Sequence, residues 1–108
     1  MVRDRNIEKA KKVLEKLHQV AQGQVSPICS YKLTSYLSKC GIQAHKDRNV
    51  LHIVVSALRR AKLTVKAMDR RKDGKIYLIL HKDEIPKLKK AMKMLEDDPL
   101  TVVYGSLY

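Results

Sequence analysis

The sequence has no Phe and no Trp, and its only aromatic residues are five Tyr. A hydrophobic core must therefore be built from aliphatic side chains. No apolar run approaches the roughly 20 residues that a transmembrane helix needs. Residues 1–5 do not lead into the apolar core of a signal peptide either. We therefore expect no membrane partner and a cytoplasmic location.

Cysteine is also scarce, because Cys29 and Cys40 are the only two. A secreted domain stabilised by disulfides usually carries more, and a zinc site needs further ligands at recognisable spacing. His45 and His52 lie near Cys40 in the sequence, but no C-x-x-C or H-x-x-x-H pattern is present. We expect no metal and no cofactor, and two reduced cysteines that behave as small apolar residues.

The sequence contains no recognisable catalytic set. Acidic residues are few and mostly isolated, and no Gly-rich phosphate-binding loop is present. A nucleophile pair of Cys40 and His45 is conceivable, but no third residue that would orient the histidine is visible. We therefore expect a binding protein and not an enzyme.

Charge is the most informative property of the composition. The chain carries 23 Lys and Arg against 11 Asp and Glu, a formal net charge of +12. Such an excess on a small domain indicates a polyanionic partner. The alternative is a Lys-rich surface that only aids solubility. The length of 108 residues and the 44% hydrophobic content fit one folded domain with appended helices.

Residues 6–22 have the pattern of an amphipathic helix. Its apolar residues recur at steps of three and four: Ile7, Ala10, Leu14, Leu17 and Ala21. This seam either packs against the helix's own domain or forms a dimer contact. Gly23 and Pro27 end the helix, and residues 25–28 could form a very short strand.

A second helix is predicted from Ser30, as its N-cap, to the Cys40–Gly41 turn. A third follows, whose start is predicted at Asp47 or at Gln43, with Asp47 as cap the stronger case. Its buried face is predicted at Val50, Ile53, Val54, Ala57, Leu58 and Ala61. Its opposite, polar face is predicted at Arg48, Asn49, His52, Ser56, Arg59 and Arg60.

The period then changes to two, which predicts strands over residues 64–68 and 75–80. Asp73–Gly74 between them is a strong hairpin signal. The hairpin tip is strongly basic, with Arg70, Arg71, Lys72 and Lys75.

A last helix is predicted over residues 82–98. Asp83 and Glu84 lie near its start, and Pro86 is tolerated in its first turn. Its lysine-rich side faces outward, and its apolar seam could pack or form a dimer contact. The tail, residues 99–108, is apolar and β-prone, and is either a docked arm or a frayed end.

The order helix, short strand, helix, turn, helix, basic hairpin resembles the winged helix-turn-helix superfamily of DNA-binding proteins. The resemblance covers residues 25–81. It is carried by Tyr-Lys-Leu-Thr-Ser-Tyr-Leu at 31–37, Gly41–Ile42, the helix of residues 50–63 ending in Leu-Arg-Arg-Ala-Lys-Leu, and the hairpin of residues 64–80. It implies an α+β fold, a winged helix-turn-helix with long flanking N- and C-terminal helices. Residues 1–24 and 82–98 are similar to the dimerisation helices of small bacterial and archaeal regulators.

The resemblance also implies which residues bind. Arg48, Asn49, His52 and Ser56 would face the major groove, while Lys46 and Arg59 or Arg60 would contact phosphates. Ser30, Tyr31 and Lys32 would offer backbone N–H groups at a helix N-terminus to a further phosphate. Arg70, Arg71, Lys72 and Lys75 would reach the minor groove or backbone.

The expected function is therefore DNA binding by a homodimeric, nucleoid-associated regulator or a partition or chromatin protein, with double-stranded DNA as partner. The recognition helix has few long hydrogen-bonding side chains beyond Arg48 and Asn49, so a largely nonspecific, architectural binder remains open. The alternative is an RNA–protein assembly or ribosome-associated winged-helix module, in which the basic wing meets RNA.

Overall fold

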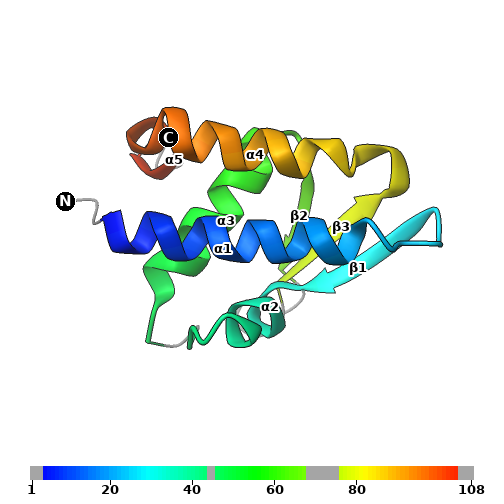
Figure 1. Cartoon of the computed structure of the whole chain (residues 1–108), viewed down its shortest axis with the longest axis horizontal. Helices are drawn as coiled ribbons and strands as arrows, with labels where there is room; N and C mark the ends of the chain where they lie inside the picture. The colour runs from blue at the N-terminus through cyan, green and yellow to red at the C-terminus, as the bar shows by residue number, and fades with distance from the viewer. Residues whose placement is uncertain (1–3, 44–45, 68–75, 105–108) are drawn as a thin grey trace.

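The computed structural model describes residues 4–43, 46–67 and 76–104. Within them the chain is α+β, with five α-helices, one 3-10 helix and three strands (Figure 1). In chain order these are α1 (Asp4–Ala21), β1 (Ile28–Lys32), α2 (Leu33–Lys39), α3 (Arg48–Arg60), β2 (Thr64–Ala67), β3 (Ile76–His81), η1 (Lys82–Glu84), α4 (Pro86–Asp97) and α5 (Pro99–Tyr104).

The strands form one antiparallel sheet in the order β1-β3-β2. The predicted hairpin strands therefore pair, with Thr64 opposite Ile79. Residues 68–75, where the hairpin turn with Asp73–Gly74 is predicted, lie outside the described residues. Leu78 and Leu80 of the central strand are fully buried, because one face of the sheet packs against the helices.

The core is mostly aliphatic, as the lack of Phe and Trp predicts, and Tyr31 and Tyr36 are its buried aromatic residues. All six α3 positions predicted to be buried are at most 3% exposed, so that prediction is confirmed. The largest fully buried side chains are Val13, Leu14, Leu17, Leu33, Leu37, Val50, Val54, Leu58, Leu78, Leu80, Leu88 and Leu95. They come from all four longer helices and from the sheet, and so fix α3 in the middle of the fold.

The apolar seam of α1 is used inside the chain. α1 packs against both α3 and α4, with α3 crossing behind it (Figure 1). Its seam residues Ile7, Ala10, Leu14, Leu17 and Ala21 are all buried. Of the two expectations for this seam, the structure favours packing on its own domain, and the seam is not available for a dimer contact in the folded chain. In the predicted apolar seam of the last helix, Leu88 and Leu95 are fully buried, and Ile85 and Met92 are half-buried against the core.

The turn after α2 has the predicted chemistry. Gly41 has a φ of +75°, in the left-handed region that favours glycine. Its N–H donates to the Ser38 carbonyl at 3.0 Å, and the Ile42 N–H donates to the Leu37 carbonyl at 2.9 Å. This pair of hydrogen bonds is a Schellman motif. Ile42 and Leu37 are both buried, which supplies the apolar contact that accompanies the motif.

The predicted start of the second helix is wrong. Ser30 lies in β1, opposite Ile79 of β3, and α2 begins at Leu33. The predicted strand over residues 25–28 is also displaced, because β1 begins at Ile28. Strand pairing with β3 takes the backbone of residues 28–32, and this overrides the local preference of Ser30 for a helix cap.

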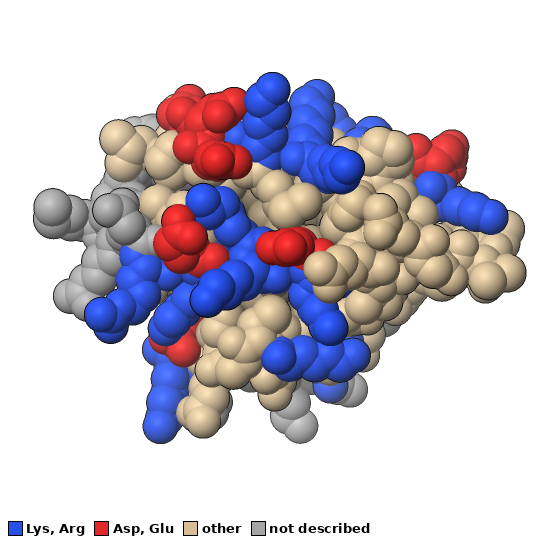
Figure 2. Space-filling view, viewed as in Figure 1, with Lys and Arg blue, Asp and Glu red and all other residues tan. Residues whose placement is uncertain are grey.

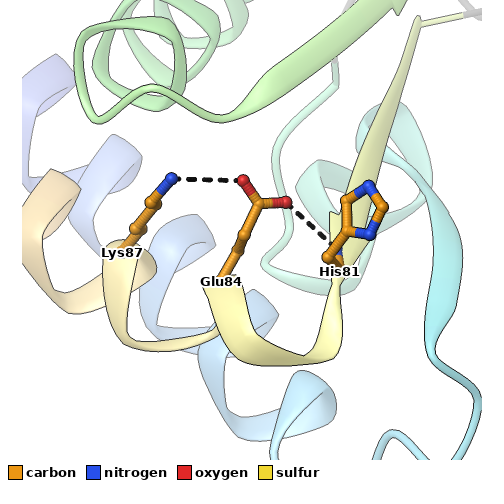
Figure 3. Close-up of polar contacts among 3 residues, drawn as sticks. All are labelled: His81, Glu84 and Lys87. Carbon is orange, nitrogen blue, oxygen red and sulfur yellow. Dashed lines mark hydrogen bonds and ion pairs between the residues drawn. The ribbon is translucent and has the colours of Figure 1, made fainter.

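The passage from β3 into α4 is held by Glu84 (Figure 3). Its Oε1 accepts a hydrogen bond from the His81 backbone N–H at 3.2 Å, and its Oε2 accepts one from Lys87 Nζ at 3.2 Å. Pro86 occupies the first turn of α4, as expected. Glu84 therefore joins the end of the sheet to the first turn of the helix.

The C-terminal tail does not have the predicted β character. Residues 99–104 form α5, and Val102 is 1% exposed against α3 and α4. The expectation that this segment docks on its own chain is therefore met by α5, although as a helix. Residues 105–108 lie outside the described part.

Candidate nucleic-acid interface

One side of α3 is exposed along the whole helix. Its residues are Arg48, Asn49, His52, Val55 and Arg59, and we call them the α3 outer face. All are exposed except Val55, which is half-buried. Positions 48, 52, 55 and 59 are spaced at four, three and four residues, which places them in one row along the helix. Because the opposite side of α3 is buried in the core, this row is held on a rigid support.

The charge around the α3 outer face is nearly all positive. Between residues 46 and 62, Asp47 is the one acid, against four exposed cations: Lys46, Arg48, Arg59 and Lys62. Asp47 Oδ1 lies 3.7 Å from Lys9 Nζ of α1, so its charge is partly offset. No side-chain cap hydrogen bond from Asp47 is present, although α3 does begin directly after it, as predicted. This region suits a polyanion.

The surface over α1 and α4 is different. Figure 2 shows Lys and Arg on both helices with Asp and Glu set among them. Glu8, which is paired with Lys11 at 3.1 Å, and Asp97 are examples of these acids. A surface with both positive and negative charges attracts a polyanion less than a surface with positive charges alone. Electrostatics therefore favours α3 over this face.

Ser56 does not belong to the interface, and its predicted place in the groove is wrong. It is only 4% exposed, and its hydroxyl donates to the backbone carbonyl of Val102. The reason is α5, which folds back over this edge of α3. Helical spacing places Ser56 on the polar side of α3, but spacing in α3 alone cannot show that another helix covers it.

Arg60 is also separated from the outer face. It lines a pocket of about 400 Å³ between α3, α4 and α5, with Lys90, Lys93 and Asp97 among its neighbours. Its Nε is buried and has no hydrogen-bond partner among the described residues. Arg59 is exposed, so of the two arginines predicted to contact phosphates only Arg59 lies on the outer face.

The helix N-terminus predicted at residues 30–32 is displaced, because these residues form β1 and pair with β3, and only Lys32 adjoins the start of α2. Tyr31 is buried, and its hydroxyl donates to Gln24 Oε1 at 2.7 Å. Burial raises the pKa of Tyr31 to about 12, with a smaller contribution from Cys29. Ser30 and Lys32 are exposed on the sheet, and Lys32 directly precedes α2 as its N-cap residue.

The remaining predicted residues fall into two groups. Lys46 is exposed just before α3. The wing residues Arg70, Arg71, Lys72 and Lys75 lie outside the described residues, as does His45.

The sequence prediction missed Lys62. It is exposed and has a φ of +67°, an unusual value for a residue with a side chain. It lies just beyond the C-terminal end of α3, in the turn that closes the helix. Its place in the sequence, directly after the Arg59–Arg60 pair and Ala61, is the signal that could have found it.

Among the residues that the structure describes, no group of three or more His, Cys, Asp and Glu is placed to hold a metal ion. None of the helices in this part of the chain combines the length and the apolar character that a membrane crossing requires. Comparisons with protein-family models, with curated proteins and with solved structures find no match to this chain.

Proposed function

We propose that the chain is a winged helix-turn-helix protein that binds double-stranded DNA. α2 is then the positioning helix, α3 the recognition helix, and β2 and β3 with residues 68–75 the wing. The element order and the β1-β3-β2 sheet support this assignment. The observation that carries the function is the α3 outer face, an exposed basic row on a helix whose other side is buried.

The dimensions of α3 suit a major groove. Its 13 residues make a helix about 20 Å long. With side chains, a helix is about as wide as the groove, which is about 12 Å across. Asn49, in the first turn, has the side chain that pairs with an adenine edge, while the neighbouring Arg48 is assigned here to the phosphate backbone. Val55, in the middle of the row, offers an apolar contact for a thymine methyl group.

Phosphate contacts would supply most of the affinity. Lys46 and Arg48 lie at the start of α3, and Arg59 and Lys62 at its end, so they can reach the backbone on either side of a groove. If each of the four neutralises one phosphate, they contribute a slope of about −3.6 to log K against log salt. The proposed wing contacts at Arg70, Arg71, Lys72 and Lys75 would make the slope steeper.

The test is a salt-titrated binding assay with a labelled duplex, read by fluorescence anisotropy. The double variant Arg48→Ala, Arg59→Ala removes two proposed phosphate contacts, so we expect weaker binding and a slope shallower by about 1.8. The matched control is Lys12→Ala, Lys89→Ala, which removes two exposed lysines from α1 and α4.

The control is expected to keep nearly the wild-type slope. An equal loss in both double variants would mean that binding depends on net charge and not on the α3 outer face. A structured RNA is measured in parallel. If it binds as well as the duplex or better, the RNA–protein assembly function is supported and DNA binding is rejected.

A further inference from the structure

The sheet has a second, outer face that none of the described helices covers. Residues that are direct partners on neighbouring strands present their side chains on the same face. The register therefore aligns Lys32, Tyr77 and Lys66 in one row across the three strands. The outer sheet face consists of Ile28, Ser30, Lys32, Thr64, Lys66, Tyr77, Ile79 and His81. Six of these are exposed, and Tyr77 and Ile79 on the central strand are half-buried.

The charged side chains on the outer sheet face are all of one sign, positive. The described strands β1, β2 and β3 contain no Asp and no Glu, so no acid of these strands lies beside Lys32 or Lys66. Between these lysines lies the ring of Tyr77, and beside it the next row has Ile79 at its centre. Ile28, at one edge, is 52% exposed although it is a large aliphatic residue. The face is thus an aromatic and aliphatic strip with a cation on either side.

Such a strip matches a single-stranded nucleic acid better than a duplex. Strands lie about 4.8 Å apart, so the Lys32 and Lys66 backbones are about 10 Å apart with Tyr77 between them. A base can stack on an exposed aromatic ring only when its own face is free, and in a duplex the base faces are covered by their neighbours. An acidic peptide would engage the two lysines but has no planar group for the tyrosine.

We propose that the outer sheet face is a second nucleic-acid site, which binds single-stranded DNA or RNA. Tyr77 stacks on a base, and Lys32 and Lys66 bind the phosphates on either side of it. The site shares no residue with the α3 outer face, so it does not depend on the proposed duplex binding.

The experiment measures binding of labelled 12-nucleotide oligo-dT and oligo-U to the full chain by fluorescence anisotropy. Tyr77→Leu keeps an apolar residue on the strand but removes the ring, and it is expected to weaken binding about tenfold or more. Tyr77→Phe keeps the ring and is expected to bind within about twofold of wild type, because stacking does not need the hydroxyl. Comparing the two oligomers shows whether DNA or RNA is the preferred strand.

Charge is tested separately with Lys32→Glu, Lys66→Glu, against the matched reversal Lys12→Glu, Lys89→Glu on the helices. The sheet reversal is expected to weaken oligomer binding and to make its salt slope shallower by about 1.4, since single strands lose about 0.7 per phosphate contact. Arg48→Ala, Arg59→Ala is expected to leave oligomer binding unchanged, which separates this proposal from the duplex proposal.

Three results would overturn the site. The first is that Tyr77→Leu binds the oligomers as tightly as wild type does. The second is that the charge reversal on the helices weakens binding as much as the charge reversal on the sheet. The third is that an acidic peptide displaces the oligomer from wild type and binds Tyr77→Leu equally well. Circular dichroism confirms folding of each variant, and if Tyr77→Leu does not fold, the sheet reversal carries the test.

Discussion

Lys62 has a backbone conformation that a glycine would adopt more easily, and this predicts a stabilising substitution. The residue follows the last turn of α3 with a φ of +67°. Its N–H donates to the Arg59 carbonyl at 3.0 Å, and the Leu63 N–H donates to the Leu58 carbonyl at 3.0 Å. This is the same Schellman motif that ends α2, where the left-handed position is Gly41.

The magnitude follows from comparing the two residue types. The left-handed conformation costs a residue with a Cβ about 1–2 kcal/mol, whereas glycine adopts it freely. Glycine also loses more backbone entropy on folding, which reduces the gain in stability by about 0.5–1 kcal/mol. We therefore expect Lys62→Gly to raise the free energy of unfolding by about 0.5–1 kcal/mol. For a chain of this length that is a rise in Tm of about 2–4 °C.

The assay is thermal and urea unfolding followed by circular dichroism, with two comparisons. Lys62→Ala removes the same charge but keeps a Cβ, so it should gain little stability. Gly41→Ala is the converse change, and a Cβ there would meet no atom within 4 Å, so only backbone strain is added. It should lower the free energy of unfolding by about 1 kcal/mol. A destabilised Lys62→Gly, or an unchanged Gly41→Ala, would refute this account of the two turns. Both Lys62 variants should weaken duplex binding alike, because both remove the same proposed phosphate contact.

Three further predictions concern single residues or pairs. Ser56→Ala should lower the free energy of unfolding by about 1 kcal/mol, because the buried hydroxyl bonds the Val102 carbonyl; unchanged duplex binding would confirm that Ser56 is not in the groove. Tyr31 has a folded pKa of about 12, above its ordinary value of 10, so its stabilising effect is present below pH 10 and is lost as the pH rises through 12. The stability advantage of wild type over Tyr31→Phe should therefore shrink by about 2–3 kcal/mol between pH 9 and pH 12, and a constant difference in urea unfolding would contradict this. Asn49→Ala should change sequence preference in a binding selection, whereas Arg70→Ala with Arg71→Ala should weaken all sequences alike; a preference that survives Asn49→Ala would remove Asn49 from the groove.

Much of the fold could be predicted because local rules and tertiary packing agree in most elements. The helical spacing of apolar residues located α1, α3 and α4, and the left-handed glycine located the turn after α2. Prediction failed where tertiary packing competes with a local preference. Ser30 is a good helix cap in isolation, but β1 pairs with β3 about 50 positions later in the chain. The tail has β-prone residues, but α5 buries Val102 against α3 and α4.

The candidate site could also be predicted where helix geometry decides, and not where tertiary packing decides. The exposed positions of Arg48, Asn49, His52 and Arg59 follow from helix geometry alone. The positions of Ser56 and Arg60 depend on α5, which the sequence did not predict as a helix. The outer sheet face was not found, because its central row joins residues from three strands, and only the register places them together.

The central claim is that the α3 outer face is the surface that meets duplex DNA. The most direct measurement is a titration of the isotope-labelled chain with a short duplex, followed by backbone amide NMR shifts. We predict the largest changes at Arg48, Asn49, His52, Arg59 and Lys62, with small changes along the exposed side of α1. The largest changes at Lys12, Lys89 and Lys93 would instead place the duplex on α1 and α4, and would contradict the account.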